Sequence, residues 1–360
     1  MRRAHAGLLL ALLPFAAAAQ APQVAATAPV DTAGAAETAE AAMPPDATPA
    51  LVPTTRSGRE IYRRFREGLA DPVCEPGSSS PRWRKHFAAA PVRLADADDD
   101  VLALFGYVVD ALREASLPTE YALIPFVESG YKPAARSRQG PAGMWQMIRL
   151  TARAHHVPMH RGYDGRLSPV ESTRAAVRYL KTLHGMFAGD WRLAVMAYNA
   201  GEYRVFGALR RAGQVARDAD PEKLTSLSGI TRAYVRKLHA LSCLFDRADD
   251  GGDWLQSLDR QVPLLEPVEL PAEVRDLRAW AQANGRDPAR VQRLNPAFAG
   301  GRLARGERER RVLVPAMAPP LLAAEAATAP LHAPDPAAEA SLEAPSAPVA
   351  AGPDGAAQAH

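Results

Sequence analysis

Apolar residues recur at intervals of three and four along the middle of the chain. The clearest run lies between residues 101 and 112 and stops at Leu117-Pro118. This spacing is typical of a helix that buries one face. An acidic run at residues 96–100 precedes it, and we expect these side chains to cap its first turn.

Two further helices have recognisable ends. Ser168-Pro169-Val170-Glu171 has the form of a capping box with proline at the first helical position. Asp190 and Gly201 are suited to begin and end another helix. We therefore predict a mainly α-helical domain over residues 96–250, preceded by a helical extension over residues 58–95.

The pattern changes in residues 264–316. Leu277 to Asn284 and Pro288 to Leu294 predict two short helices, and Arg311 to Pro315 predicts a terminal strand. This β-α-α-β order, with Asn295 after the second helix, resembles a degenerate LysM-like module whose usual opening residues are missing. The resemblance implies glycan binding, and the missing opening equally favours a structural brace against the helical domain.

Two segments rich in alanine and proline flank these domains, residues 22–57 and 317–360. Neither carries a periodic apolar face that could offset the entropy lost on ordering. We predict that both are disordered, the first as a linker and the second as a tail.

Residues 1–21 combine a basic start, an apolar stretch and a zone of small residues. This pattern predicts a cleaved signal peptide, which is too short to span a membrane. The first cysteine is Cys74, far from the cleavage zone, so we expect no lipid anchor. The prediction is a periplasmic protein. Association with the outer membrane and the oligomeric state stay open.

Charge and cysteine content narrow the chemistry. The chain has 43 Lys and Arg against 40 Asp and Glu, a formal charge of +3. Loss of Arg2 and Arg3 with the signal peptide lowers this by two, to +1, so the charge gives no basis for a nucleic-acid partner. Cys74 and Cys243 can either pair in an oxidising compartment or serve as buried small side chains.

A cluster of histidines raises the question of a metal. His155, His156 and His160 fit no established zinc spacing. No glycine-rich phosphate loop and no Gly-x-Ser-x-Gly elbow occurs in the chain either. We expect neither a metal nor a cofactor.

The most informative carboxylate is Glu128. It follows seven uncharged residues, 121–127, and precedes Gly130, which is suited to a left-handed helix cap. Desolvation at the end of a buried helix would raise the pKa of Glu128, so that it could act as a general acid. On this local pattern alone, a surface Glu at a helix end is an equally good interpretation.

Other fragments favour catalysis. Glu128-Ser129, the block from Gly143 to Gln146, Ala197-Tyr198-Asn199 and a late Tyr234 occur in this order. We predict that the block from Gly143 to Gln146 opens a helical run through Ala154. Together the fragments resemble the soluble lytic transglycosylase domain of bacterial murein-cleaving enzymes, and most of all its membrane-bound lytic transglycosylase D branch. The resemblance covers roughly residues 59–316 and implies a lysozyme-like helical catalytic domain with a cleft.

The resemblance implies a role for each matching residue. Glu128 would be the single general acid and base, cleaving peptidoglycan glycan strands with formation of a 1,6-anhydromuramoyl end. The implied substrate-contacting or orienting residues are Ser129, Ser137, Gly143, Met144, Gln146, Tyr198, Asn199 and Tyr234.

Two alternatives remain at this point. A lysozyme-like hydrolase shares the fold and the Glu but uses water, and usually has a further Asp near the cleft, for which Asp164 and Asp190 are candidates. A non-catalytic protein that binds the cell wall could also keep this fold. The intact set of motif residues argues against the latter.

Overall fold

The computed structural model describes residues 51–319 apart from 76, 78 and 251. The segment predicted as a signal peptide, 1–21, lies outside the described residues. So do most of the two Ala/Pro-rich segments.

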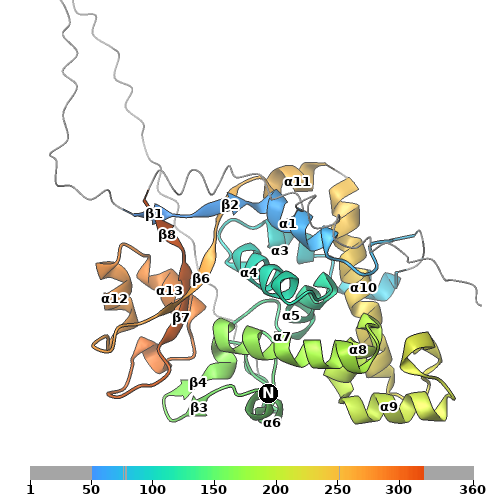
Figure 1. The fold of residues 1–360 in the computed structure, drawn as a ribbon. Helices are drawn as coiled ribbons and strands as arrows, with labels where there is room; N and C mark the ends of the chain where they lie inside the picture. Colours follow the sequence, from blue (N-terminus) through green and yellow to red (C-terminus); the bar gives the residue numbers. More distant parts are fainter. Residues whose placement is uncertain (1–50, 76, 78, 251, 320–360) are drawn as a thin grey trace, which may run out of the picture. The chain divides into compact units, whose positions relative to one another are not determined.

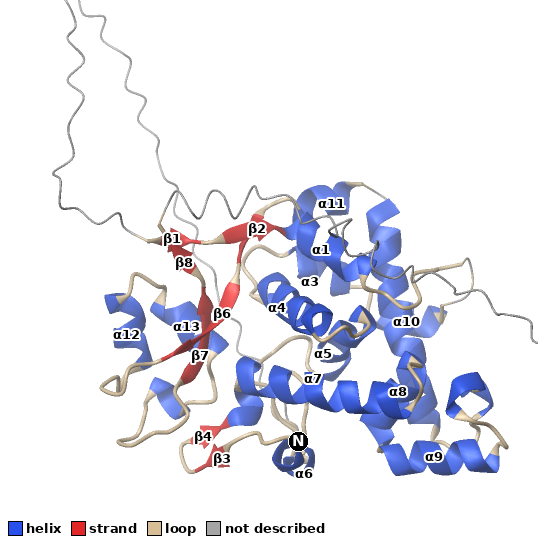
Figure 2. Cartoon of the chain, in the orientation of Figure 1, coloured by secondary structure: helices blue, strands red, loops and turns tan. Residues whose placement is uncertain are grey.

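The described chain is mainly helical, as predicted (Figures 1 and 2). Its helices, from the N-terminal extension to the end of the large domain, are α1 (Gly58–Glu67), α2 (Pro81–His86), α3 (Ala90–Ala95), α4 (Val101–Glu114), α5 (Ile124–Glu128), α6 (Arg149–Ala154), α7 (Pro169–Met186), α8 (Trp191–Ala200), α9 (Glu202–Arg211), α10 (Gly229–Asp250) and α11 (Asp253–Leu258).

Helix α4 lies in the core of the large domain and packs against α1 and α7. Its apolar positions are almost fully buried, as their spacing predicts. Phe105 of α4 joins an aromatic cluster with Phe126 of α5 and Phe245 of α10, whose ring centroids lie 5.9 and 6.4 Å from its own. This cluster anchors the short α5, which ends at Glu128.

The buried helix expected to end at Glu128 is divided in two just before Pro125. A 3₁₀-helix runs from Thr119 to Leu123, and α5 begins at Ile124. Proline lacks a backbone N–H and fits the first turn of a helix better than its interior. Pro125 therefore lies in the first turn of a new helix, and Gly130 follows α5 with the left-handed φ of 62° expected for it.

The ends of the other predicted helices are largely confirmed. The Oγ of Ser168 accepts a hydrogen bond from the Glu171 amide at the start of α7, and the carboxylate of Asp190 accepts from the first-turn amides of α8. Asp100 differs from the expectation, since its side chain makes no cap hydrogen bond. It instead pairs with Arg290, 2.7 Å away, and with Arg293.

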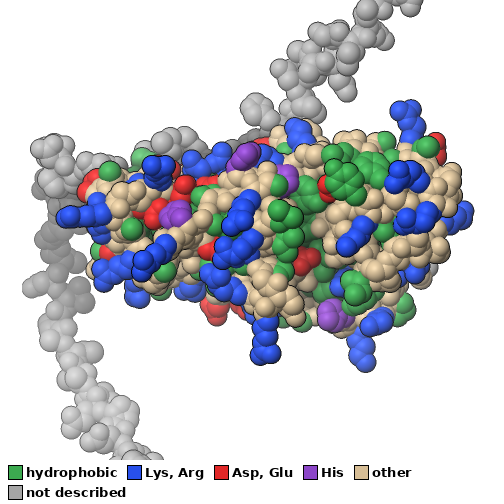
Figure 3. Space-filling model, turned by 90° about the horizontal axis from the view of Figure 1, so that it is seen from below, with side chains coloured by type: hydrophobic (Ala, Val, Ile, Leu, Met, Phe, Trp, Pro, Cys, Tyr) green, Lys and Arg blue, Asp and Glu red, His purple; other side chains and the backbone are tan. Residues whose placement is uncertain are grey.

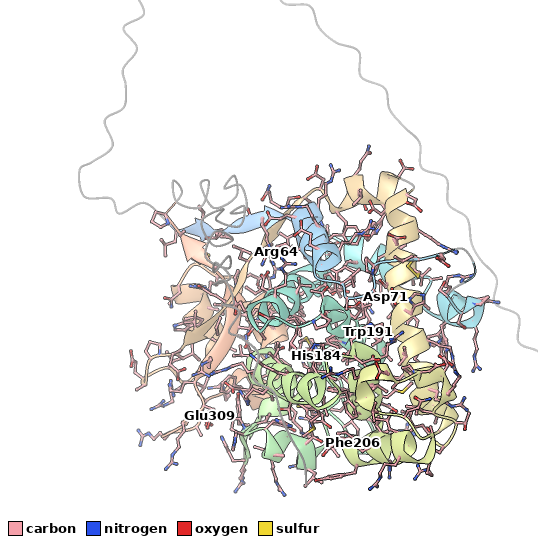
Figure 4. All side chains as sticks on the ribbon, turned by 45° about the vertical axis from the view of Figure 1, so that its right-hand side comes forward. Arg64, Asp71, His184, Trp191, Phe206 and Glu309 are labelled. Atoms are coloured by element: carbon pink, nitrogen blue, oxygen red, sulfur yellow. A yellow bond between two sulfur atoms is a disulfide. The ribbon has the colours of Figure 1, made fainter. Side chains whose placement is uncertain are left out.

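Connections between helices are also fixed by aromatic contacts. Phe206 of α9, labelled in Figure 4, stacks on Phe187 with ring centroids 4.7 Å apart. Phe187 is the C-cap residue that directly follows α7. This contact therefore fixes α9 against the C-terminal end of α7.

Residues 264–316 form the predicted β-α-α-β unit. Strands β6 (Leu265–Glu269) and β7 (Arg311–Pro315) pair antiparallel, with Pro267 opposite Leu313. Helices α12 (Leu277–Ala283) and α13 (Pro288–Leu294) lie between them in the chain. The unit has its own buried cluster, which also takes in Ala142, Tyr163 and Leu167 of the large domain.

The limits of the two Ala/Pro-rich segments need correction. Residues predicted to belong to the linker form β1 (Val52–Pro53) and β2 (Thr55–Ser57), and the predicted tail begins with β8 (Met317–Ala318). β1 pairs with β8, and β2 pairs with β5 (Gln261–Pro263). These strands satisfy their backbone groups with partners more than 200 residues away, which a local sequence pattern does not reveal.

Cys74 and Cys243 form a disulfide, with Cα atoms 5.5 Å apart. The bridge joins the segment before α2 to α10, and α2 packs against the same helix.

Among the described residues, no helix is both long and apolar enough to cross a bilayer.

Removing this disulfide tests its contribution to stability. The bridge closes a loop with a sequence separation of 169, and cross-links of this length restrict the unfolded chain strongly. We expect Cys74→Ser to lower the free energy of unfolding by about 2–5 kcal/mol, as measured by urea denaturation. Reductant should lower the wild type to the level of the variant and leave the variant unchanged. Two free thiols in unreduced, denatured wild type would refute the bridge.

Candidate functional site

A cleft of about 400 Å³ opens where the end of α5, the loop before α6 and the end of α8 come together. Of the residues singled out from the sequence, Glu128, Gln146, Tyr198 and Asn199 line it. Figure 3 views the molecule from below and shows an acidic side chain within a hollow, with hydrophobic and basic side chains around it. The structure therefore brings these four residues together at one concave site.

Glu128 is the last residue of α5 and is half-buried. Its Oε1 accepts a hydrogen bond of 2.5 Å from the hydroxyl of Tyr234, on α10. Burial raises the pKa of Glu128 above its ordinary value, while the Tyr234 hydrogen bond and the charge of Lys237 act in the opposite direction and offset it only in part. A carboxyl group of this kind can hold a proton toward neutral pH and donate it.

Tyr198 connects three parts of the cleft. Its hydroxyl donates to the backbone carbonyl of Trp145 at 2.8 Å. Trp145 is fully buried, and its indole N–H donates to Thr173 of α7 at 3.0 Å. Burial raises the pKa of Tyr198 well above its ordinary value, and the nearby Glu128 adds to this effect. Tyr198 is therefore a neutral hydrogen-bonding group that holds the loop of residues 143–146 against α8.

The block from Gly143 to Gln146 forms a tight loop, whereas the sequence predicts that it opens a helix running to Ala154. Gly143 has a φ of 81° and Gln146 a φ of 45°, and an α-helix does not accommodate such angles. Helix α6 begins only at Arg149. A Cβ on Gly143 would lie 1.7 Å from the carbonyl oxygen of Arg166, so the loop requires glycine at this position.

The remaining motif residues lie around the cleft and are not among its lining residues. Ser129 donates to the backbone carbonyl of Met144 at 2.9 Å, and the Met144 side chain is buried. Ser137 donates to Gln139 on the outer part of the loop. Within the lining, Asn199 accepts from the Thr231 hydroxyl at 3.0 Å and so links α8 to α10.

Several cleft residues were not singled out from the sequence. Tyr179 of α7 and Arg204 of α9 line the cleft, and the Tyr179 ring lies 5.8 Å from that of Tyr198. Lys237 does not line the cleft, but its ammonium group lies 5.9 Å from the centre of the Tyr234 ring and acts on Glu128 through its charge. Of these, only Lys237 had a usable signal, since it stands one helical turn after Tyr234 and faces the same way.

The two aspartates considered as second acids have other partners. Asp164 is paired with Arg166 at 2.9 Å and with Arg136 at 3.3 Å, and Asp190 caps α8. Among the described residues that line the cleft, Glu128 is the one carboxylate. Glu202 lies close by, where it accepts a 3.4 Å hydrogen bond from Tyr179, but it is not part of the lining.

The described part of the chain contains no group of three or more His, Cys, Asp or Glu side chains suited to hold a metal ion. His155 packs against the ring of Tyr179, with centroids 4.7 Å apart, and His160 lies 3.1 Å from Glu307. The histidines are thus engaged in separate contacts.

Comparison with known proteins shows which family this part of the chain resembles. Residues 109–220 match the family described as the Transglycosylase SLT domain. The membrane-bound lytic murein transglycosylase D of Escherichia coli (strain K12) is 36% identical over 176 residues, which cover 48% of this chain and 38% of that protein. The peptidoglycan transglycosylase gp16 of Escherichia phage T7 is 40% identical over 83 residues, 23% of this chain and 6% of that protein.

Among solved structures, the 70 kDa soluble lytic transglycosylase of Escherichia coli aligns with a TM-score of 0.32 and 16% identity, covering 57% of this chain and 42% of that chain. The family match confirms the resemblance identified from the sequence. The chain spans well under half the length of the membrane-bound lytic murein transglycosylase D that it matches.

The pKa of Glu128 can be tested through stability. Because its folded pKa is raised, the folded protein holds this proton more tightly than the unfolded chain does. As pH rises from the ordinary pKa to the raised one, the unfolded chain loses its proton first, and the free energy of unfolding falls. Glu128→Gln removes this contribution, so the variant should gain stability relative to wild type across that interval.

Urea unfolding of both proteins from about pH 4 to about pH 8, a range that brackets the ordinary Glu value, measures the difference. We expect the gap to widen with pH and then to level off. Parallel stability curves over the whole range would contradict a raised pKa at Glu128.

Proposed function

We propose that this chain, which carries a Transglycosylase SLT domain over residues 109–220, is a peptidoglycan lytic transglycosylase with Glu128 as its single general acid and base. The observation that carries the proposal is the half-buried carboxyl of Glu128, held by Tyr234 in a cleft whose lining includes no other carboxylate among the described residues. The names of the relatives, a murein transglycosylase and a peptidoglycan transglycosylase, support the substrate class.

In the first step, protonated Glu128 donates to the glycosidic oxygen between N-acetylmuramic acid C1 and N-acetylglucosamine. The C1–O bond breaks, and the leaving sugar keeps the proton as its hydroxyl. The 2-acetamido group of the muramoyl sugar stabilises the positive charge at C1. The raised pKa of Glu128 serves this step because it keeps the donor protonated.

In the second step, Glu128 is a carboxylate and acts as the base. It takes the proton of the C6 hydroxyl, whose oxygen bonds to C1 and closes a 1,6-anhydro ring. Glu128 is thereby protonated again, and no water is consumed. An intramolecular hydroxyl has already lost most of its positional entropy, which favours it over water.

Ordinary glycosidases use a second carboxylate to attack the sugar or to activate water. Here Asp164 forms ion pairs with Arg166 and Arg136, and the carboxylate of Asp190 caps α8. The internal hydroxyl is therefore the better nucleophile. These placements favour the transglycosylase over the lysozyme-like hydrolase.

The other motif residues take supporting roles in this proposal. Gln146, in the cleft wall, would bind the acetamido or glycan groups, and Ser137 would join it from the outer loop. Tyr234 would orient Glu128 and favour the carboxylate formed midway through the reaction. Tyr198 and Asn199 would hold the two walls together through Trp145 and Thr231.

The proposed function also implies where the enzyme acts and what its C-terminal unit does. Peptidoglycan lies in the periplasm, and the predicted signal peptide at residues 1–21 would deliver the chain there. The β-α-α-β unit over residues 264–316 has the element order of a degenerate LysM-like module, so it is a candidate for glycan binding or for bracing the cleft.

Glu128→Gln tests the acid directly. The amide keeps the size and the acceptor for Tyr234, but it neither donates nor takes up the catalytic proton. We expect clearing of purified murein to fall by at least about 10²–10⁴-fold with the fold intact. The matched control is Glu222→Gln, an exposed carboxylate paired with Arg236, which should keep wild-type activity. Near-normal activity in Glu128→Gln would remove Glu128 from this role.

The product distinguishes the transglycosylase from the hydrolase. Digestion of murein sacculi should release fragments that end in 1,6-anhydro-N-acetylmuramic acid, each one water lighter than the hydrolytic product. Borohydride should leave their masses unchanged, because the anhydro end has no reducing aldehyde. Mass spectrometry before and after reduction measures this. A majority of reducible ends would make the protein a hydrolase.

A further inference from the structure

The C-terminal unit, residues 264–316, adds to a hairpin of the large domain. That hairpin consists of β3 (Met159–His160) and β4 (Tyr163–Asp164). The Asp164 amide donates to the Ala297 carbonyl at 3.2 Å, and the Ala299 amide donates to the Gly162 carbonyl at 3.3 Å. The ring of Phe298 packs on that of Tyr163 with centroids 4.9 Å apart. Both rings are nearly fully buried, so Tyr163 of the hairpin belongs to the buried cluster of the C-terminal unit.

Directly after the hairpin, Arg166 joins it to the cleft loop. Its guanidinium forms a two-point pair with Asp164, with nitrogen–oxygen distances of 3.0 and 2.9 Å. Burial alone would raise the pKa of Asp164, but the hydrogen bond and charge of Arg166 outweigh it and hold that pKa below its ordinary value. The pair is therefore ionised and fixed in orientation.

The third nitrogen of the same guanidinium, Nη1, faces the loop of residues 135–147. This nitrogen donates to the carbonyls of Gly140 at 2.7 Å and Met147 at 3.2 Å. The Arg166 carbonyl lies where a Cβ of Gly143 would be. Gln146, in the cleft wall, in turn donates to the Gly143 carbonyl at 2.8 Å. One buried residue, 2% exposed, thus bridges the C-terminal unit and the wall that faces Glu128.

We propose that the C-terminal unit positions the Gly143–Gln146 wall of the cleft through Phe298, Tyr163 and Asp164, with Arg166 as the positioning residue. This inference rests on the proposed function for its effect on catalysis. Its structural part, the coupling of residues 297–299 to residues 135–147, is independent of it.

The physical reason is the unusual shape of the wall. Gly143 and Gln146 both have positive φ, and a loop of this kind persists only when its surroundings determine it. Within the loop, carbonyls accept hydrogen bonds from the backbone amides of Ser137, Gly140, Ala142, Gly143, Gln146 and Met147. From outside the loop, Arg166 bonds to the carbonyls of Gly140 and Met147, in addition to the contacts that Tyr198 and Ser129 make with it.

Hydrogen exchange of the full-length protein, read by mass spectrometry, tests the coupling without any need for activity. The variants are Arg166→Lys, which keeps the charge but not the three-way fork, and Phe298→Ala in the C-terminal unit. In both, peptides covering residues 135–147 should exchange at least about tenfold faster than in wild type, while α4 and α10 stay protected.

The matched control is Arg302→Lys. Arg302 is exposed and pairs with Asp276 inside the C-terminal unit, 3.6 Å away, so its replacement should leave the loop and the activity unchanged. Unchanged exchange of residues 135–147 in Arg166→Lys and Phe298→Ala would overturn the proposal. Equal deprotection of α4 and the loop would also overturn it, because the effect would then be general destabilisation.

Activity gives the second readout. In Arg166→Lys and Phe298→Ala, kcat/KM on murein should fall about 10- to 100-fold, since small misplacements of a cleft wall have effects of this size. The pH dependence should not move, because Glu128 and Tyr234 are untouched. A shifted pH profile would contradict a purely positioning role. Absence of lytic activity in the wild type would instead refute the proposed function and leave the exchange result standing.

Discussion

The carboxyl group of Glu128 sits at the end of a five-residue helix, and much of the large domain serves to hold it there partly out of water. So short a helix has little stability of its own. Phe126, two residues earlier, inserts into the aromatic cluster of α4 and α10, and Tyr234 of α10 donates to the carboxyl itself. Desolvation favours the protonated acid, and the tyrosine moderates that preference. In the proposed mechanism Glu128 must both give and take a proton, and this balance suits both steps.

The opposite wall of the cleft is held by different means. The Gly143–Gln146 loop has no helix or strand to define it, and its conformation depends on Tyr198 from α8, on Arg166 and on glycine at position 143. Arg166 is oriented by Asp164, and Asp164 lies in a hairpin that bonds to the C-terminal unit. A continuous series of hydrogen bonds therefore links the C-terminal unit to this wall of the cleft. In this account the small unit contributes to the site from a distance, whether or not it binds glycan.

Much of this arrangement could be predicted from residue patterns. The apolar spacing of α4, the caps at Ser168 and Asp190 and the apolar run before Glu128 are local signals, and the structure bears them out. Properties that depend on distant partners could not be predicted in this way. Asp100 has the pattern of a cap but pairs with Arg290, nearly 200 residues later. Strands β1 and β2 exist because β8 and β5 bond to them. The loop at Gly143 looks helical in sequence, but Gly143 and Gln146 adopt positive φ there, and distant residues, Arg166 and Tyr198, contact the loop in that shape.

The central claim is that the sugar's own hydroxyl, and not water, completes the reaction begun by Glu128. Digestion in ¹⁸O-labelled water tests this most directly, with murein whose existing reducing ends have first been reduced by borohydride. The account predicts that the new muramoyl ends carry no ¹⁸O, because the oxygen that closes on C1 comes from C6 of the same sugar. Incorporation of one ¹⁸O per bond cleaved would show that water is the nucleophile and would contradict the account.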